Sequence, residues 1–394
     1  MSPHAPRSSP APAPSPAVRP RRRSSRDRPT VLLTGAAGVL GRALLEELLV
    51  DHDVVCMRHR TPLGDPRVRE VKGNLLEPRL GMTRAERFTL ASEVDLVVHS
   101  AAATSWQLSP ENIHRTNVQG TEAVIDIAER AEAPVYYMST AFVANPLSAA
   151  DRERFPGAAA YLASKTEAER RLRDARVPGV ILRPSVVMGD SCTGQIAGAQ
   201  GLTTALAAIV LGQVPVVPGA PGTRIDCVPQ DYLARATVDL MRSGVTEGEF
   251  WLTAGKRALV LHDIVRTCAD FAEHLGLPRP TPPRLLPVES VHRLLMPLLD
   301  GTALPARTRK QFRNYAELLL VFQRALPFET DLGRSCGTEV TEGVLQDALL
   351  RNLESWADDR SGMISRIRRQ SRSTARNAPR FHPQSGGRVR ERAS

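Results

Sequence analysis

The sequence predicts an α/β protein, with a doubly wound parallel sheet followed by a smaller, mainly helical C-terminal cap. Three observations predict this fold. Strand-like and helix-like segments alternate over about 155 residues, Thr30–Pro184, which is typical of a parallel sheet with helices on both faces. A glycine-spaced turn, Gly35–Gly41, joins the first strand to the first helix. From Leu261 to Asp359 the hydrophobic pattern is chiefly helical.

The first strand, turn and helix lie in the stretch TVLLTGAAGVLGRALLEELLV. Its glycines have the spacing G-x-x-G-x-x-G: Gly35 permits a sharp turn, Gly38 lets the backbone approach a pyrophosphate, and Gly41 lets the helix pack on the sheet. Backbone N–H groups at the helix N-terminus would face the phosphates. A tight βα corner without a ligand fits the same spacing. The dinucleotide contacts expected here are Gly35, Gly38, Val39, Leu40, Gly41 and Arg42.

The second strand, Asp53–Met57, is followed by arginine and not by an acid. At this position of a doubly wound sheet, Asp or Glu binds the 2′-hydroxyl of the adenosine ribose, whereas arginine accommodates a 2′-phosphate. We therefore expect NADP(H) rather than NAD(H) as the cofactor, with Arg58 as the phosphate clamp and Arg60 or Arg42 as assistants. The alternative is that Arg58 is a solvated charge at the end of a strand.

Three later strands bring small or polar residues to the same edge of the sheet, where ligands bind in open α/β sheets. These strands are Val68–Leu75, Val94–His99 and Gly179–Arg183. The second of them is a continuous apolar run of the kind that is buried on both faces. The cofactor contacts expected at the three strand ends are Asn74, Leu75, Ala101 and Pro184.

Tyr161 and Lys165 lie four residues apart in the predicted helix Ala158–Arg173, so they share one face, about 6 Å apart along the axis. A phenol with a pKa of roughly 10 is a weak acid at neutral pH unless a nearby cation favours its ionised form. Lys165 is expected to do this and to bind the nicotinamide ribose. Thr140, after the strand Pro134–Ser139, supplies a second donor. Together they would polarise a carbonyl during hydride transfer, although a Tyr–Lys pair at this spacing also occurs by chance.

The formal net charge of +10 is concentrated at the two ends of the chain. Residues 1–29 contain seven arginines and one acid, and residues 361–394 contain nine arginines and one acid. Such segments cannot bury enough apolar surface to offset the entropy of ordering. We therefore predict disordered basic tails at 1–28 and 361–394, an NADP-binding domain at 29–200 and a substrate-binding cap at 201–360.

Arginine-rich tails can contact nucleic acid, anionic lipid or an acidic partner. A solvated extension is the favoured interpretation, and nucleic acid is not an expected partner. The five cysteines are scattered, without a C-x-x-C pair, which argues for reduced thiols in the cytoplasm and against a zinc site. No apolar run reaches the roughly 20 residues of a membrane span. A soluble cytoplasmic protein without a metal is expected, and a homodimer is left open.

Taken together, five motifs resemble the extended branch of the short-chain dehydrogenase/reductase superfamily, over Pro29–Gly255. They are Thr34–Gly41, Asn117–Thr121, Ser139-Thr140, Tyr161-x-x-x-Lys165 and Arg183-Pro184-Ser185. The resemblance implies a Rossmann-type fold. It also implies that Thr140, Tyr161 and Lys165 form a catalytic triad, supported by Asn117.

Within the superfamily, the sequence most resembles the thioester reductase and fatty acyl-CoA reductase branch. The motifs that carry this resemblance are GNLLEPRLG at 73–81, VHSAA at 98–102, MSTA at 138–141 and GDSCTG at 189–194. Two residues depart from the branch. Asn74 stands where aspartate is usual, and Val39 where an aromatic residue is common.

That branch reduces acyl thioesters with NADPH to aldehydes, and in some members onward to alcohols. The resemblance implies an acyl thioester substrate, held by coenzyme A or by a carrier protein in trans. A leucine-rich cap suits an acyl chain, and the same leucines equally suit plain helix packing. The alternatives are a sugar-nucleotide epimerase or dehydratase, a steroid or alcohol dehydrogenase of the same superfamily, and a protein that binds the nucleotide without turnover.

Overall fold

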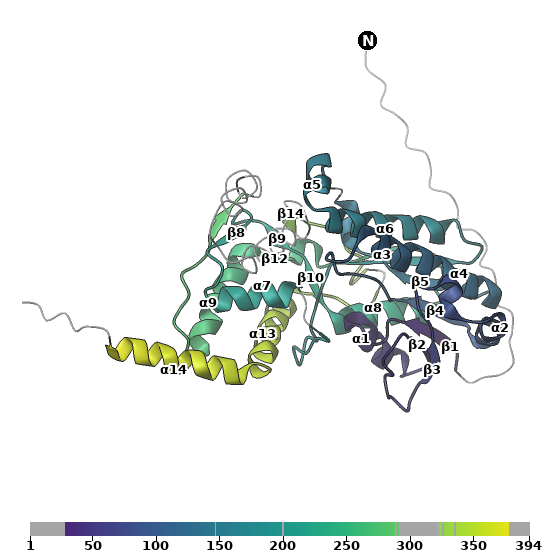
Figure 1. Cartoon of the computed structure of the whole chain (residues 1–394), viewed down its shortest axis with the longest axis horizontal. Coiled ribbons are helices and arrows are strands. Elements are labelled where there is room, and N and C mark those ends of the chain that lie inside the picture. Colours follow the sequence, from purple (N-terminus) through teal and green to yellow (C-terminus); the bar gives the residue numbers. More distant parts are fainter. Residues whose placement is uncertain are drawn as a thin grey trace, which may run out of the picture.

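The computed structural model describes residues 28–145, 147–198, 201–287, 290, 321, 323–324, 327–334 and 336–377. Its largest feature is a seven-stranded sheet in the order β11-β6-β5-β4-β1-β2-β3, and every pair in it is parallel (Figure 1). The strands are β1 (Thr30–Thr34), β2 (Asp53–Arg58), β3 (Arg69–Lys72), β4 (Leu96–His99), β5 (Val135–Met138), β6 (Gly179–Pro184) and β11 (Gly248–Leu252). The predicted doubly wound sheet is confirmed.

The strand order reverses at β1, which pairs with β2 on one side and with β4 on the other. Thr34, the last residue of β1, aligns with both Met57 and His99. At such a switch point the connections after neighbouring strands diverge to opposite faces, which leaves a crevice outside the carboxyl ends of the strands. The cofactor contacts predicted after β1, β2 and β4 therefore converge on one crevice.

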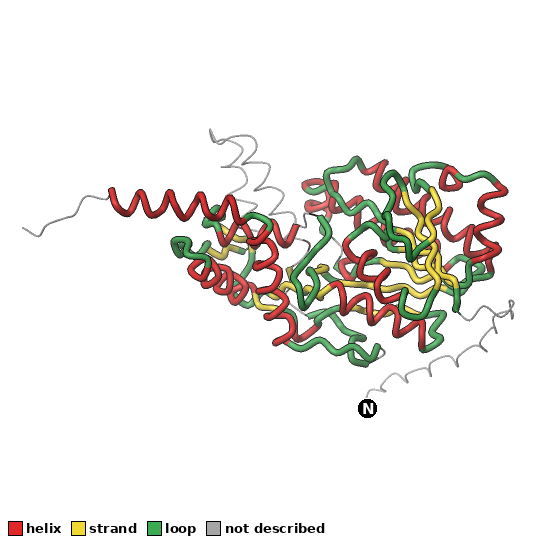
Figure 2. The backbone as a smooth tube through the Cα atoms, turned by 90° about the horizontal axis from the view of Figure 1, so that it is seen from below, coloured by secondary structure: helices red, strands yellow, loops and turns green. Residues whose placement is uncertain are grey.

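Helices cover both faces of the sheet (Figure 2). On one face α1 (Val39–Leu48) and α8 (Gln230–Arg242) pack on each other, and the other carries α2 (Arg84–Glu93), α4 (Gly120–Ala131) and α6 (Pro156–Arg173). Alternate residues of β1 enter opposite cores. Val31 and Leu33 join the cluster that contains α1, and Leu32 joins the cluster that contains α4. The two-sided burial explains why this strand is apolar throughout.

The chain also forms a smaller, mainly helical part beside the sheet, as predicted (Figure 1). Its core consists of α7 (Gly201–Val210), α9 (Leu261–His274) and α13 (Glu342–Asp358), which contact one another. Its short strands are β7 (Val186–Met188) with β10 (Cys227–Pro229), β8 (Val216–Pro218) with β13 (Arg284–Leu286), and β9 (Arg224–Ile225) between β12 (Leu259–Val260) and β14 (Gln323–Arg324).

Short helices complete the described elements. α3 (Pro110–His114) and α5 (Ala149–Arg154) contact α6. Single turns of 3₁₀-helix occur at Pro78–Gly81, Ala141–Ala144 and Gly255–Arg257. Within the part of the chain that the structure describes, no helix is long and apolar enough to cross a bilayer, and no group of His, Cys, Asp or Glu residues could hold a metal ion.

The domain boundary predicted at residue 200 does not separate two units. After α7 the chain returns to the sheet, because α8 packs along α1 and β11 pairs with β6, from Gly248 beside Val180 to Leu252 beside Pro184. The side chain of Leu233 on the inner face of α8 is fully buried. Residues 230–252, which the sequence analysis assigned to the cap, thus complete the sheet unit.

Residues 361–377 form helix α14 (Ser361–Asn377), where the sequence analysis predicted a disordered tail. Ile364 is buried, and Met363 and Ile367 pack against the same hydrophobic core. These residues lie at helical spacing, so a single apolar stripe suffices to hold the first half of the helix. The second half extends away from the body of the protein (Figure 1). The predicted tails at residues 1–27 and 378–394 lie outside the described residues.

Candidate active site

Close backbone contacts hold the glycine turn after β1. Gly35 has a φ of +79°, and a Cβ on it would lie 2.6 Å from the backbone nitrogen of Ala101. A Cβ on Gly41 would lie 1.9 Å from the carbonyl oxygen of Gly35, which also accepts the Gly38 N–H at 2.8 Å. Ala37 and Gly38 are exposed at the N-terminus of α1. The turn therefore presents bare backbone where an anion such as a pyrophosphate would bind.

A cavity of about 460 Å³ opens between this turn, the end of β2 and the loop after β3. Part of its wall is apolar, from Met57, Leu63 and Leu76, which suits the face of an adenine ring. Five of the predicted cofactor contacts line it: Gly35, Arg58, Asn74, Leu75 and Ala101. None of the described residues in its wall is Asp or Glu. The cavity thus has the shape and the chemistry of an adenosine site without the acid that would bind a free ribose diol.

The basic end of this cavity is formed by Arg58, His59 and Arg60. Arg58 Nε lies 3.4 Å from Glu70 Oε2, and the Glu70 carboxylate also accepts the N–H of Leu63 at 3.1 Å. Glu70 therefore holds the Arg58 side chain in position through this ion pair. Arg58 is not a free solvated charge, because it has this ion-pair partner and lines the cavity.

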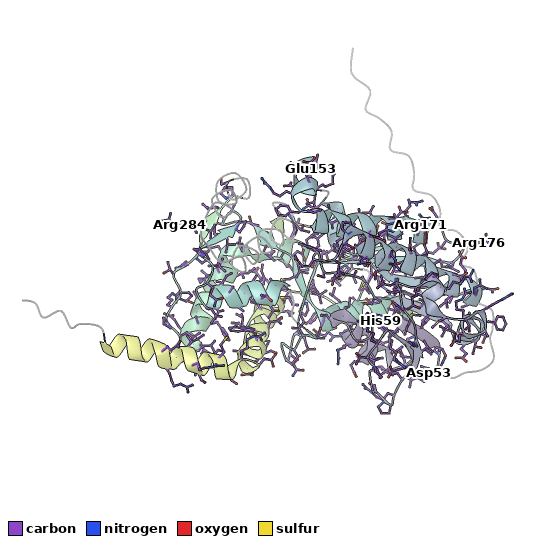
Figure 3. The ribbon with its side chains drawn as sticks, in the orientation of Figure 1. Asp53, His59, Glu153, Arg171, Arg176 and Arg284 are labelled. Carbon is purple, nitrogen blue, oxygen red and sulfur yellow. The ribbon has the colours of Figure 1, made fainter. Side chains whose placement is uncertain are left out.

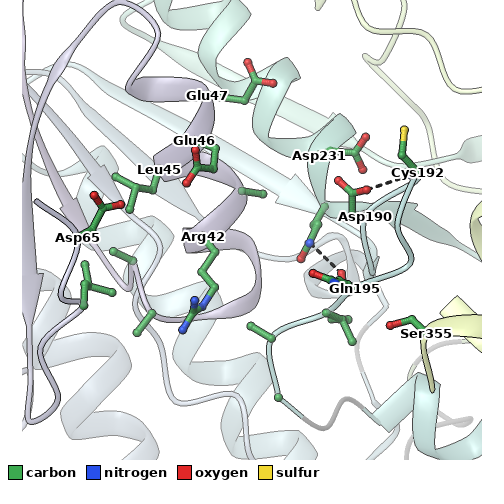
Figure 4. Close-up of a pocket in the computed structure, with 18 of the residues that line it drawn as sticks. Arg42, Leu45, Glu46, Glu47, Asp65, Asp190, Cys192, Gln195, Asp231 and Ser355 are labelled. Carbon is green, nitrogen blue, oxygen red and sulfur yellow. Dashed lines mark hydrogen bonds between the residues drawn. The ribbon is translucent and has the colours of Figure 1, made fainter. Parts of the chain in front are cut away.

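A second cavity, of about 950 Å³, lies between α1, the loop 190–198, α8 and the end of α13. Figure 4 shows Arg42 projecting from α1 on one side, and Asp190 and Gln195 of the loop on the other. It meets the first cavity at Ala36, Ala37 and Leu63. Arg42 therefore lies on the opposite side of the glycine turn from Arg58, and its predicted role as an assistant at the ribose is not supported by its position.

Besides Gly38 and Gly41 of the turn, three predicted contacts line neither cavity. Leu40 packs in the hydrophobic core, Val39 is the half-buried first residue of α1, and Pro184 is the buried last residue of β6. Leu40 therefore serves helix packing. Sequence spacing alone could not separate the residues whose backbone borders the ligand from those whose side chain faces it.

Thr140, Tyr161 and Lys165 are brought together by β5 and α6. Thr140 follows β5, and its Oγ1 accepts the N–H of Phe142 at 3.4 Å. Thr140 lies close enough to the Tyr161 side chain to lower the pKa of its phenol. Lys165 Nζ donates to the carbonyl oxygen of Met138 at 2.7 Å. The set lies at the carboxyl edge of the sheet, although none of the three lines either of the two cavities.

Asn117 ties the loop after β4 to the helix that carries Tyr161. It lies in a turn of π-helix, Arg115–Gln119, that leads into α4. Its Oδ1 accepts the N–H of Ala103 at 2.7 Å, and its Nδ2 donates to the Ala103 carbonyl at 3.0 Å and to Ser164 Oγ at 2.9 Å. Ser164 Oγ in turn donates to the Tyr161 carbonyl at 2.7 Å. Asn117, which positions Tyr161 through Ser164, thus lies in a π-turn. Such turns are frequent at functional sites.

The ionisation of Tyr161 and Lys165 differs from the sequence-based expectation that the ammonium raises the acidity of the phenol. Burial raises the pKa of Tyr161 to about 12, opposed by the nearby Thr140 hydroxyl. Burial lowers the pKa of Lys165 to about 7, opposed by the charge of Glu169. Lys165 Nζ lies 4.8 Å from the centre of the Tyr137 ring and is bonded to a carbonyl, so its charge is directed at β5. In this structure the phenol is a protonated donor.

His99, which the sequence analysis did not select, links the glycine turn to Asn117. Ala101 N–H donates to Thr34 Oγ1 at 3.2 Å, and Thr121 Oγ1 donates to the Asn117 carbonyl at 2.6 Å. The Thr34 hydroxyl must therefore donate to His99 Nδ1 (2.7 Å), and His99 Nε2–H to Thr121 (3.0 Å). Burial lowers the His99 pKa to about 3, so the imidazole stays neutral and keeps this tautomer. The signals in the sequence were its position at the end of an apolar strand and its place in the motif VHSAA at 98–102.

Comparisons with known proteins agree with this architecture. Residues 59–237 match the NAD_binding_4 family, described as male sterility protein. Hybrid PKS-NRPS synthetase pvhA from Talaromyces variabilis is 30% identical over 57% of this chain and 6% of the synthetase. Hybrid PKS-NRPS synthetase poxE from Penicillium oxalicum is 33% identical over 41% of this chain and 4% of the synthetase. The chain therefore spans only a small fraction of the length of these relatives.

The fold is also similar to that of solved reductase domains. The terminal R domain of the myxalamid PKS-NRPS pathway has a TM-score of 0.63 and 23% identity, and the match covers 85% of this chain and 92% of that domain. The R domain of a nonribosomal peptide synthetase from Mycobacterium tuberculosis has a TM-score of 0.57 and 24% identity, with 83% and 92% covered. Bordetella bronchiseptica WbmH in complex with NAD+ has a TM-score of 0.51 and 23% identity, with 67% and 91% covered. At these identities the likeness shows the fold.

The glycine cradle at Gly35 and Gly41 and the cavity beside it fit a dinucleotide. Together with the Thr140–Tyr161–Lys165 set at the same sheet edge, they define a nicotinamide-dependent oxidoreductase. The family match covers β3 to α8, and so includes this set. This family match and the fold shared with solved R domains agree with the predicted resemblance to the thioester reductase branch of the extended short-chain dehydrogenase/reductases.

Proposed function

We propose that the chain reduces an acyl thioester with NADPH, to an aldehyde and free thiol. The observation that carries this proposal is that the Thr140 and Tyr161 side chains lie together at the carboxyl edge of the sheet, the edge at which the glycine turn and the first cavity also lie. Two hydroxyl donors side by side are suited to a substrate oxygen that gains charge. These donors would suit any carbonyl substrate. We propose a thioester because the sequence resembles the thioester reductase branch.

NADPH is proposed over NADH because of the wall of the first cavity. Arg58 and Arg60 line that wall at and after the end of β2, and no acid lines it among the described residues. A 2′-phosphate would receive charge-assisted hydrogen bonds from these guanidinium groups. A ribose diol would find no carboxylate to accept its hydroxyl protons.

In the proposed mechanism, the bound nicotinamide supplies a hydride to the thioester carbonyl carbon. Thr140 and Tyr161 donate hydrogen bonds to the carbonyl oxygen, and these strengthen as the oxygen becomes anionic. Because burial raises the pKa of Tyr161 to about 12, the phenol is protonated at neutral pH. It passes its proton to the oxygen, which gives a hemithioacetal. As the carbon–sulfur bond then breaks, the hydroxyl proton transfers to the sulfur, so that aldehyde and free thiol are released. The phenolate of Tyr161 regains a proton from solvent.

We propose a carrier-bound acyl chain as the substrate. The relatives named above are PKS-NRPS synthetases, a class of enzyme that holds its intermediates as thioesters on carrier domains. A carrier domain and coenzyme A end in the same phosphopantetheine arm, so an acyl-CoA should also react, with a higher KM.

The test follows NADPH absorbance at 340 nm with purified protein and a panel of acyl-CoA, acyl-pantetheine, aldehyde and sugar-nucleotide substrates. Thioester-dependent oxidation of NADPH, with the aldehyde trapped as a hydrazone and free thiol released, would support the proposal. Turnover of aldehydes or alcohols without any thioester reaction would assign an alcohol dehydrogenase. Conversion of a sugar nucleotide without net change in NADPH would assign an epimerase or dehydratase.

A further inference from the structure

A buried carboxylate lies one helical turn beyond Lys165 on α6. Glu169 is 2% exposed. Its oxygens accept hydrogen bonds from Ser139 Oγ at 2.5 Å, from Arg183 Nε and Nη2 at 3.0 and 2.6 Å, and from Arg173 Nη2 at 2.9 Å. Glu169 therefore links the end of β5, β6 and α6 next to the residues of the proposed catalytic set.

Two of these contacts lead to the reacting residues. Ser139 immediately precedes Thr140, so its bond to Glu169 fixes the segment after β5 that places Thr140 near Tyr161. Lys165 is four residues before Glu169, a spacing at which side chains on a helix interact. The charge of Glu169 favours the protonated form of Lys165, against the cost of burial.

The other groups that face Lys165 do not supply this charge. On β4, His99 is neutral at neutral pH because its pKa is lowered to about 3. On β5 and α6, the pKa values of Tyr137 and Tyr161 are raised by burial, so both are protonated. Arg183 of β6 is paired with Glu169 itself. Among the described residues, Glu169 is the acid that acts on Lys165.

We propose that Glu169 is a positioning residue for the reaction: it favours the charged form of Lys165 and, through Ser139, holds Thr140 near Tyr161. The effect on turnover rests on the proposed function, whereas the effect on the charge of Lys165 does not. The chain offers a matched control in Glu249. It belongs to the same network, pairing with Arg183 and Arg173 at 2.7 Å each, but it lies on β11, beyond those arginines.

The first test measures the charge of Lys165 directly. The chain has four lysines, at 72, 165, 256 and 310, so full-length protein labelled with ¹³C-lysine gives four sets of side-chain NMR signals. Those of Lys165 are assigned with Lys165→Arg. In Glu169→Gln the Lys165 pKa should fall by about one unit, a tenfold change in the protonation equilibrium, and in Glu249→Gln it should change much less. Equal shifts in both variants, or no shift in Glu169→Gln, would overturn the proposal.

The second test measures turnover against pH. In Glu169→Gln, kcat should fall about fivefold at pH 7 and recover as the pH is lowered, because Lys165, which is expected to bind the nicotinamide ribose in its charged form, then regains its proton. A loss of kcat that is constant across pH would indicate structural damage and would contradict the positioning role. A wild type that reduces no thioester would overturn the proposed function, and the NMR shift would still decide the role of Glu169.

Removing one partner of a buried ion pair can unfold a protein. Should Glu169→Gln not fold, Arg173→Met replaces it, because Arg173 has a 43% exposed side chain. Without the charge of Arg173, less of the negative charge of Glu169 is neutralised by arginine. The pKa of Lys165 should therefore rise. A fall or no change would overturn the proposal.

Discussion

Gly41 and Gly35 touch through their backbones, since a Cβ on Gly41 would lie 1.9 Å from the carbonyl oxygen of Gly35. The same oxygen accepts the Gly38 N–H, so one carbonyl group contacts both Gly38 and Gly41 at the start of α1. The obstacle is backbone rather than a flexible side chain, and only a shift of the helix could make room. The position of the anion-binding N–H groups therefore depends on the absence of a side chain at position 41.

Gly41→Ala should weaken NADPH binding at least about tenfold and lower the free energy of unfolding by about 1–3 kcal/mol, the usual cost of overpacking. Fluorescence titration with NADPH and urea denaturation measure the two effects. Gly222→Ala is the control, because a Cβ there would meet nothing within 4 Å. Wild-type affinity in Gly41→Ala would refute the proposed cradle.

Tyr161→Phe should lower kcat by about 10²–10⁴-fold, the range expected for loss of a general acid, while NADPH affinity stays within about twofold. Thr140→Val should give a smaller loss, because Tyr161 still donates to the substrate oxygen. Steady-state kinetics on an acyl-CoA measure both. Tyr232→Phe, on α8, is the control that keeps activity. Undiminished turnover by Tyr161→Phe would remove the phenol from the mechanism.

Arg58→Ala should abolish the preference for NADPH over NADH, with NADPH affinity falling about tenfold or more, because a charge-assisted hydrogen bond contributes about 1.5–3 kcal/mol. Arg60→Ala should have a weaker effect of the same sign. Arg42→Ala is the control, since Arg42 lines the other cavity, and it should leave the preference unchanged. Equal affinity of the wild type for both cofactors would contradict the clamp.

The buried Lys165 makes stability depend on pH. Its pKa is lowered from 10.5 to about 7 by burial, whereas in the unfolded chain it returns to its ordinary value. Between these values the unfolded state binds more protons, so this residue adds stability as the pH rises. The stability of Lys165→Met relative to wild type, from urea denaturation, should therefore decrease between pH 7 and about pH 9. Buried cysteines affect both proteins equally, and a constant difference would contradict the lowered pKa.

Truncation should separate α14 from the tails beyond it. A chain of residues 28–377 should keep the melting temperature and the kcat of the full chain. A chain that ends at residue 360 loses Ile364, which is 3% exposed, and should be less stable by about 1–3 kcal/mol. Thermal denaturation of both chains measures this. Equal stability of the shorter chain would show that α14 contributes nothing to the core.

The sheet could be predicted from the sequence because its signals are local. Each strand is a short apolar run, and the contact between Gly35 and Gly41 joins residues only six positions apart. The Tyr161–Lys165 pair could likewise be recognised, since both residues share one helix. The sequence also placed Arg58 correctly, because a strand end determines which edge of a parallel sheet a residue occupies.

What the sequence could not show depends on contacts between distant segments. Glu169 lies in an ordinary helical pattern, and its importance appears only when Ser139 and Arg183 approach it from two strands. The ionisation of Tyr161 was predicted with the wrong sign for the same reason. Helical spacing places a lysine near a phenol, but burial and the carbonyl of Met138 decide where its charge acts. The boundary at residue 200 was wrong because β11 returns from far along the chain.

The return of β11 to the sheet has a practical consequence for anyone who expresses part of this protein. A fragment that ends at residue 200 would leave β6 as an edge strand with unpaired N–H and C=O groups, and such edges promote aggregation. It would also strip α8 from α1 and expose Leu44, which is fully buried in the complete chain. The shortest unit with a closed hydrophobic interior therefore extends at least to Leu252.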